Sequence, residues 1–287
     1  MCIIADEIES VSKTKIFVAT NPTKTRQITV YSNFVNSVVN NNAMILPIPS
    51  SQNVDFIDLS NYKDIFDDCK SSFYDLNFSL GMRTKSFSMN SKNILPVFNV
   101  GSYQVSLALN FEQLSNVNKN VFQLRDDLKK MLYEFYSNPN WGFIICKLSK
   151  GPEEYHPFAY SHNIVDNKLF IPTRHFHVES TNNTQINNNM WMDGTSMSNY
   201  SFINTNTNTN TNAYKKIADD WEHDIYIVNF DINKNQYITQ FNSCKDVWSN
   251  ENNVNYSKIR FNFDKCNSFT KLVINGTHPN IDIICTL

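Results

Sequence analysis

The chain has 287 residues, with 25 Lys or Arg against 27 Asp or Glu, so its formal net charge is −2 and its pI is near 6.3. This balance excludes the dense basic surface that an obligate nucleic-acid partner requires. No apolar run approaches the length of a membrane span, and the mean hydropathy is −0.39, so no membrane contact is expected. The N-terminus turns acidic without a basic segment, which predicts no signal peptide and a cytoplasmic location.

Short strands are predicted along the first third of the chain. Their residues are β-branched or aromatic, and turns rich in Asn, Pro and Thr separate them. Tyr103, Val105 and Leu107 then alternate with polar residues, which is typical of a half-buried strand. The strands expected in this part are 15–20, 26–35, 43–47 and 101–110.

One amphipathic helix is predicted over residues 121–136. Apolar residues recur there at steps of three or four residues, which places them on one helical face, namely Val121, Leu124, Leu128, Leu132 and Phe135. Further strands are expected at 141–148, 154–162, 169–179, 223–230 and 258–263. A final pair is expected around a turn at Asn275-Gly276, ending with 281–285. The predicted fold class is therefore α+β, mainly antiparallel β with one prominent helix.

A polar low-complexity tract interrupts this pattern at residues 181–212. It is rich in Asn and Thr and contains a long N-T repeat, so it cannot bury enough apolar surface to order itself. We interpret it as a loop insertion into a single β-rich domain that spans residues 1–287.

Several catalytic motifs are absent from the sequence. It contains no G-x-G-x-x-G or Walker-type loop, no G-x-S-x-G elbow and no H-E-x-x-H. Rossmann dinucleotide binding and P-loop phosphate chemistry are therefore not expected.

Histidines gather between positions 156 and 223. We expect 154–162 and 169–179 to form a hairpin that turns at Asp166-Asn167. In that register His156 lies opposite His177, and His162 and His175 share their face because residues an even number of positions apart on a strand do so. A slip of one residue would place His156 on the other face.

Imidazoles and a carboxylate that converge on one sheet face resemble a zinc-like or iron site. Two alternatives stay open, namely structural packing of the imidazoles and a metal-free cleft for a small polar ligand. Glu154 is the candidate catalytic base for a metal-assisted hydrolase or oxygenase. The candidate metal ligands are His156, His175, His177, His223 and Glu179.

Cys2 is a second candidate for chemistry. Removal of Met1 would expose its thiol and α-amine together, which is the arrangement of an N-terminal-nucleophile hydrolase. The Met-Cys start is similar to that of choloylglycine hydrolases, but the Arg-x-x-Asp that those enzymes place shortly afterwards is missing. The structural alternative is a small apolar residue at a strand end.

The sequence also resembles a family of uncharacterised, leaderless, β-rich proteins with a Met-Cys start. The resemblance rests on S-K-T-K-I-F-V-A at 12–19, A-M-I-L-P-I-P at 43–49, G-S-Y-Q-V-S-L at 101–107, Y-H-P-F-A-Y at 155–160 and L-F-I-P-T-R-H-F-H at 169–177. The resemblance implies a shared fold and a cytosolic setting. It does not point to any particular activity.

Three functions follow from these patterns. The first is a protein whose histidine face binds a divalent metal or a small polar ligand, with or without catalysis. The second is a non-catalytic interaction module whose exposed aromatic residues bind a protein. The third is a hydrolase that uses Cys2.

Overall fold

The computed structural model describes residues 3–73, 94–179, 218–229, 245–249 and 253–287. Most of these residues lie in strands, and most strand pairs are antiparallel, as predicted. The strand expected at 258–263 and the turn expected at Asn275-Gly276 are wrong, because 259–263 is not a strand and one strand runs from Phe269 to Pro279. The helices are α1 (Ile65–Ser71), α2 (Asp126–Tyr136) and the 3-10 helices η1 (Glu112–Asn116) and η6 (Tyr256–Lys258). The strands are β1 (Ile3–Thr20), β2 (Arg26–Ser37), β3 (Asn42–Ile48), β4 (Asp55–Ile57), β5 (Phe98–Val100), β6 (Tyr103–Ala108), β7 (Gly142–Leu148), β8 (Gly151–Glu154), β9 (Phe158–Asn163), β10 (Lys168–Ile171), β11 (Phe176–Glu179), β12 (Ala218–Val228), β13 (Lys245–Ser249), β14 (Phe269–Pro279) and β15 (Ile283–Thr286).

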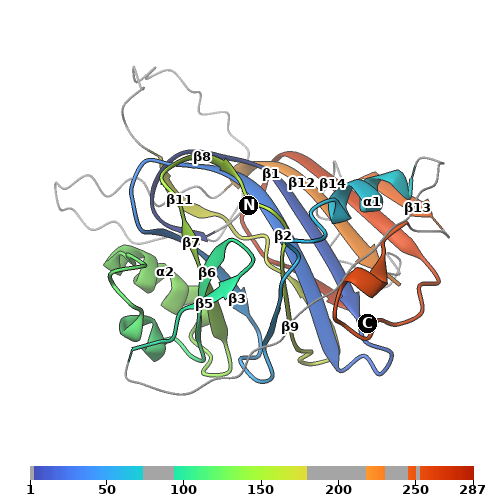
Figure 1. Ribbon diagram of the computed structural model, residues 1–287, viewed down its shortest axis with the longest axis horizontal. Coiled ribbons are helices and arrows are strands. Elements are labelled where there is room, and N and C mark those ends of the chain that lie inside the picture. The colour runs from blue at the N-terminus through green and yellow to red at the C-terminus, as the bar shows by residue number, and fades with distance from the viewer. Residues whose placement is uncertain (1–2, 74–93, 180–217, 230–244, 250–252) are drawn as a thin grey trace, which may run out of the picture.

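The large sheet divides into two wings at its longest strand, β1 (Figure 1). One edge of β1 pairs with β11 and then with β12, which both run parallel to it. The opposite edge pairs with β3 near the start of β1 and with β2 over the rest. The first wing is built around the later part of β1 and contains β14, β12, β2, β9 and β4. The second wing extends from the start of β1 through β3 and contains β3, β7, β6 and β5.

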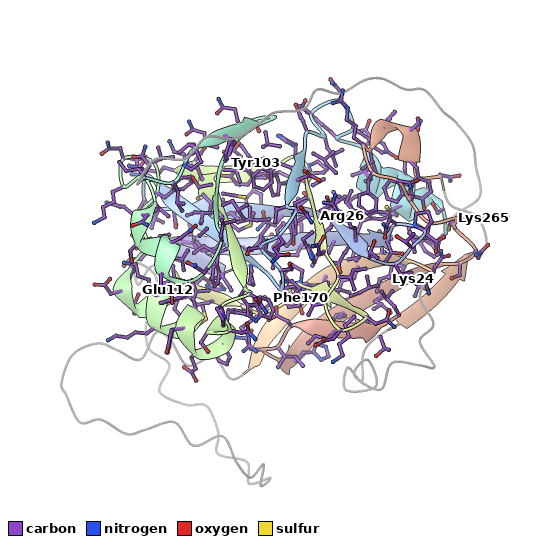
Figure 2. The ribbon with its side chains drawn as sticks, turned by 90° about the horizontal axis from the view of Figure 1, so that it is seen from below. Lys24, Arg26, Tyr103, Glu112, Phe170 and Lys265 are labelled. Carbon is purple, nitrogen blue, oxygen red and sulfur yellow. The ribbon has the colours of Figure 1, made fainter. Side chains whose placement is uncertain are left out.

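Side chains from both wings meet in an inner core, and Figure 2 shows how densely they fill the molecule. The two-stranded ribbon of β10 and β15 packs against the same core. Both faces of β3 and β7 are covered, which explains why these strands are apolar without alternation. The inner core includes Ile16, Val18, Tyr31, Tyr160, Ile225, Met44, Leu46, Val105, Ile144, Cys146, Leu169 and Ile283.

Each wing also carries an outer layer. Helix α1 and the segment 254–266 cover the outer face of the first wing, in an α1-side core that contains Phe17, Ile65, Phe66, Tyr226 and Phe269. Helix α2 and η1 cover the outer face of the second wing, in an α2-side core that contains Ile45, Phe122, Leu128, Leu132 and Phe143. The two helices therefore lie on different sides of the molecule (Figure 1).

Helix α2 begins at Asp126, later than the sequence pattern predicts. Phe122 is fully buried in the α2-side core, and the N–H of Gln123 donates to the carbonyl of Asn41 rather than within a helix. The chain before Asp126 is thus tied to other parts of the fold. From that point Leu128 and Leu132 are buried, as the spacing predicts. The expected burial of Phe135 is wrong, because its side chain is 44% exposed and the neighbouring Tyr136 is buried in its place.

The predicted hairpin of 154–162 with 169–179 is wrong, although its turn is confirmed. Asp166 and Asn167 both have positive φ (53° and 57°), as a two-residue hairpin turn requires. Beyond the Val165–Lys168 bridge the two arms separate, because β9 pairs with β2 and β4 whereas β10 pairs with β15.

Proline divides each arm of that predicted hairpin into two short strands. Pro157 lies between β8 and β9, and Pro172 lies between β10 and β11. Proline has no N–H for a sheet ladder and restricts the residue before it. The second half of each arm can therefore take a different partner, and β11 joins β1.

The low-complexity tract at 181–212 lies outside the described residues, so its interpretation as an insertion stays a prediction. None of the described helices has the length and apolar character that a membrane crossing would need.

Candidate functional site

The structure places the histidines of the predicted face in three separate environments. His156 lies between β8 and β9, His162 lies at the end of β9, and His175, His177 and His223 gather where β11 and β12 flank β1. The predicted pairing of His156 with His177 across a hairpin is wrong, because β11 pairs with β1.

His156 is held by the turn between β5 and β6. Its Nε2 accepts the N–H of Ser102 at 3.0 Å, its Nδ1 donates to the carbonyl of Pro157 at 2.9 Å, and its ring meets the Tyr103 ring edge-on at 4.9 Å. Gly101 makes this approach possible, since a Cβ there would lie 2.8 Å from the imidazole. Both ring nitrogens therefore have structural partners, which matches the packing alternative.

His175, His177 and His223 form the closest group of imidazoles. The ring centroids of His175 and His223 are 5.4 Å apart, and those of His175 and His177 are 6.4 Å apart. His223 alternates with Ile225 and so faces the inner core. The two other histidines flank Phe176, which packs into the α2-side core, so they lie on the opposite face of that strand.

The environment of this group keeps His223 neutral. Burial lowers the pKa of His223 well below its ordinary value, and the neighbouring His175 and His278 act in the same direction. The backbone of His175 is fixed by Asn280, whose side chain accepts its N–H and donates to its carbonyl. In the described part of the chain, no group of three or more His, Cys, Asp or Glu side chains could hold a metal ion. A metal role for His156, His175, His177, His223 and Glu179 therefore stays a prediction.

The other candidate residues lie apart from this group or outside the description. Glu154 is exposed on β8, and its carboxylate lies 3.9 Å from the ammonium groups of both Lys13 and Lys15. Glu179 is the last residue of β11 and is described only through its backbone, which pairs with Ile8 of β1. Cys2 lies outside the described residues, so its role stays a prediction.

A buried polar cluster around Asp282 was not foreseen from the sequence. One carboxylate oxygen accepts the N–H groups of Thr173 and Arg174, each at 3.0 Å, and the other accepts the hydroxyl of Tyr136 at 2.5 Å. The Arg174 guanidinium lies 3.6 Å from this carboxylate and donates to the carbonyl of Asn280. Burial raises the pKa of Asp282, and Arg174 opposes that shift. The cluster joins α2, the segment before β11 and the segment before β15, which lie far apart in the sequence.

Exposed apolar side chains concentrate around α2. Tyr133 is 58% exposed and Phe135 is 44% exposed on this helix, where a separation of two residues places them on opposite flanks of its buried face. The Tyr133 ring meets Phe111 edge-on at 5.2 Å, and the Arg174 guanidinium lies 3.8 Å from the centre of the Phe135 ring. Both aromatic rings are thus held in place on one side and open on the other.

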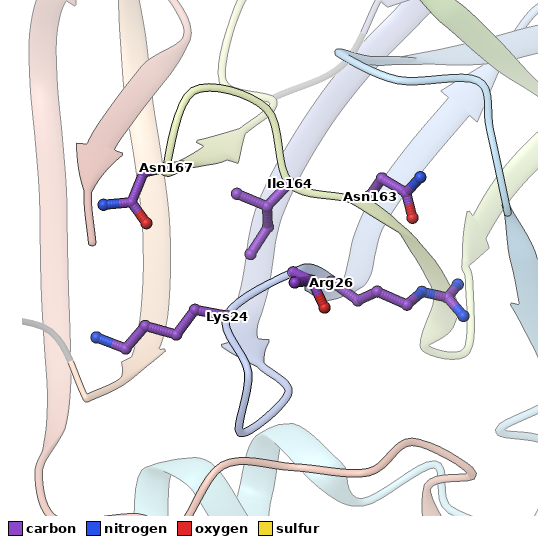
Figure 3. Close-up of a pocket in the computed structure, with 6 residues that line it drawn as sticks. Lys24, Arg26, Asn163, Ile164 and Asn167 are labelled. Atoms are coloured by element: carbon purple, nitrogen blue, oxygen red, sulfur yellow. The ribbon is translucent and has the colours of Figure 1, made fainter.

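A hollow of about 470 Å³ lies at the end of the first wing, between the turn before β2 and the turn after β9 (Figure 3). Its lining is polar apart from Ile164 and comprises Lys24, Thr25, Arg26, Ile164, Asn163 and Asn167. The Arg26 guanidinium already donates to Asp55, Ser161 and the carbonyl of Asn53. None of the histidines lines this hollow.

No family model matches the chain. Among solved structures, the chain is similar to the crystal structure of baculovirus P35, with a TM-score of 0.48 and 15% identity over 99% of both chains. The caspase-8/P35 complex gives a TM-score of 0.44 and 15% identity over 96% of each chain. A mutated baculovirus P35 after caspase cleavage gives a TM-score of 0.45 and 14% identity, over 96% of this chain and 98% of that one.

Proposed function

We propose that the chain is a non-catalytic module that binds a protein partner through the outer surface around α2. One observation carries this proposal. Of the five large hydrophobic side chains that are exposed among the described residues, four lie on α2 or beside segments that pack into the α2-side core. These four are Ile94, Leu109, Tyr133 and Phe135, and the fifth is Ile284 on β15.

The physical argument is that a concentration of exposed aromatic side chains marks a surface for binding. Aromatic residues are enriched at protein interfaces, and a few of them carry most of the binding free energy. An aromatic ring that is already fixed loses little conformational entropy when a partner covers it. Phe135 meets this condition because Arg174 stacks on its ring and is itself held beside Asp282.

The test requires a defined partner, and caspase-8, which forms a complex with P35, is the first probe. Equilibrium binding would be measured for the unchanged chain, for Y133A with F135A, and for I284A. We expect the double variant to bind at least about tenfold more weakly, as for interface residues that dominate binding. The control I284A, which truncates an exposed apolar residue on a different element, should bind as the unchanged chain does.

Binding that Y133A and F135A leave unchanged would contradict the α2 surface as the interface. Turnover of an amide or ester substrate by the purified chain would contradict the non-catalytic reading. Alkylation of thiols combined with the intact mass of the N-terminus would then test the hydrolase that uses Cys2.

A second candidate function is binding of a divalent metal by His175 and His223. The observation that favours it is the 5.4 Å separation of two imidazole centroids beside β1, with His223 kept neutral by burial. Neutral imidazole is the form that binds metal. Titration with Co²⁺ should then give a d–d absorption band that H223A removes and H156A does not. Equal spectra for all three proteins would contradict this candidate.

A further inference from the structure

Four polar side chains face the inner core where β2 pairs with β9. Gln27 lies opposite His162, and Thr29 lies opposite Tyr160, so the four form a compact block on one sheet face. Each of them is at most 1% exposed. Polar groups buried this deeply need hydrogen-bond partners, since each unpaired group costs about 1–3 kcal/mol.

Within this block, the side-chain amide of Gln27 has hydrogen-bond partners for both its nitrogen and its oxygen. Its amide nitrogen donates to Thr29 Oγ1 at 2.8 Å and to the carbonyl of Phe170 at 2.6 Å. Its amide oxygen accepts the N–H of Phe170 at 2.9 Å. Gln27 therefore replaces a strand neighbour for β10 and ties the β10–β15 ribbon to the first wing.

The other two residues, His162 and Tyr160, leave one acceptor and one donor without a short hydrogen bond. His162 Nδ1 donates to the carbonyl of Asn163 at 2.8 Å, so Nε2 of the neutral ring carries a lone pair. Burial lowers the pKa of His162 to about 4, which keeps the ring neutral at pH 7. Burial raises the pKa of Tyr160 far above its ordinary value, so its hydroxyl keeps its proton. Neither His162 Nε2 nor the Tyr160 hydroxyl has a hydrogen-bond partner within 3.5 Å in the described part of the protein, although the Thr29 hydroxyl interacts with that of Tyr160 and opposes the rise of its pKa.

We propose that one buried water molecule joins the Tyr160 hydroxyl to His162 Nε2 and takes Thr29 Oγ1 as its third partner. The two rings lie nearly parallel, with centroids 6.1 Å apart, and project from neighbouring positions on one face. Two hydrogen bonds through a water span up to about 5.6 Å. The water accepts a hydrogen bond from the Tyr160 hydroxyl and donates one to His162 Nε2 and one to Thr29 Oγ1. The Thr29 hydroxyl donates to the Tyr160 oxygen, so every group in the block has a partner.

A crystal structure of the intact chain at about 1.5 Å resolution tests this directly. We expect a density peak about 2.6–3.2 Å from both the Tyr160 hydroxyl and His162 Nε2. The same peak should vanish in H162L, which removes the acceptor. A direct hydrogen bond between the two side chains, or density without a peak at this position, would overturn the proposal.

A double-mutant cycle provides a test in solution. Y160F alone should reduce the folding equilibrium constant roughly two- to tenfold, the usual effect of one hydrogen bond. Because Y160F and H162L remove partners of the same water, the double variant should lose less than the product of the single losses, by at least about threefold. In the control pair, Y160F is combined with Y226F, and Tyr226 lies in the separate α1-side core. The losses in the folding equilibrium constant of these two substitutions should multiply. Multiplying losses in both pairs would overturn the proposal.

Discussion

Removal of the Asp282 carboxylate should destabilise the fold more than removal of any exposed acidic group. In D282A, the N–H groups of Thr173 and Arg174 and the hydroxyl of Tyr136 all lose their acceptor. The Arg174 guanidinium, only 16% exposed, also loses its counter-ion. Removing one partner of a buried ion pair costs about 3–5 kcal/mol, and we expect D282A to fall in that range.

D282N separates the two contributions to this loss. The amide oxygen can still accept both backbone N–H groups, but the charge opposite Arg174 is gone. Hydrogen bonds to charged groups contribute about 1.5–3 kcal/mol, so D282N should cost about that much, which is less than D282A.

Urea unfolding followed by circular dichroism measures both losses. D126A is the matched control, because Asp126 is 91% exposed and its one ion pair among the described residues is with Lys129 at 3.1 Å, an arrangement typical of pairs worth at most about 1 kcal/mol. A loss below about 1 kcal/mol in D282A, or equal losses in D282A and D126A, would refute the argument that this cluster joins α2 to the β10–β15 ribbon.

Three further predictions follow from single features of the chain. The free energy of unfolding should fall as the pH drops from about 6.5 towards 4, because the pKa of His162 is lowered to about 4 in the folded chain and the unfolded chain therefore binds the proton more readily. The fall should be up to about 1.4 kcal/mol per pH unit for each buried histidine. Urea unfolding midpoints measured at several pH values should show this slope, and H162L should flatten it. G101A should lower the melting temperature more than G151A, because both glycines have positive φ but only at Gly101 would a Cβ meet a side chain, His156, at 2.8 Å; equal losses would contradict this. Deletion of residues 204–212 should leave the melting temperature nearly unchanged, since an Asn/Thr repeat buries little apolar surface; a drop of many degrees would show that the tract packs on the domain.

Local patterns in the sequence were sufficient for several elements. Positive φ at Asp166 and Asn167 confirms the predicted turn, because only a few residue types adopt that backbone conformation readily. The buried face of α2 follows the spacing of Leu128 and Leu132. In both cases the interactions that decide the structure lie within a few residues of one another.

Strand partners were decided only by the tertiary structure. The periodicity of 154–162 and 169–179 is compatible with a hairpin, but β9 gains both β2 and β4 as neighbours and β11 gains β1. A strand's alternation of polar and apolar residues records which face is buried and not which strand lies beside it. The His156–His177 pair depended on that partner, so it could not be derived from spacing alone.

The buried polar groups show the same division between sequence and tertiary structure. Asp282 and Arg174 are more than a hundred residues apart, and nothing in their local sequence distinguishes them from ordinary surface charges. They meet because the β10–β15 ribbon brings the two segments together beneath α2, where burial makes a carboxylate and a guanidinium depend on one another. Composition and periodicity thus determined that this chain is β-rich and that it turns at Asp166-Asn167, whereas the long-range pairing of strands decided which of its polar side chains became neighbours.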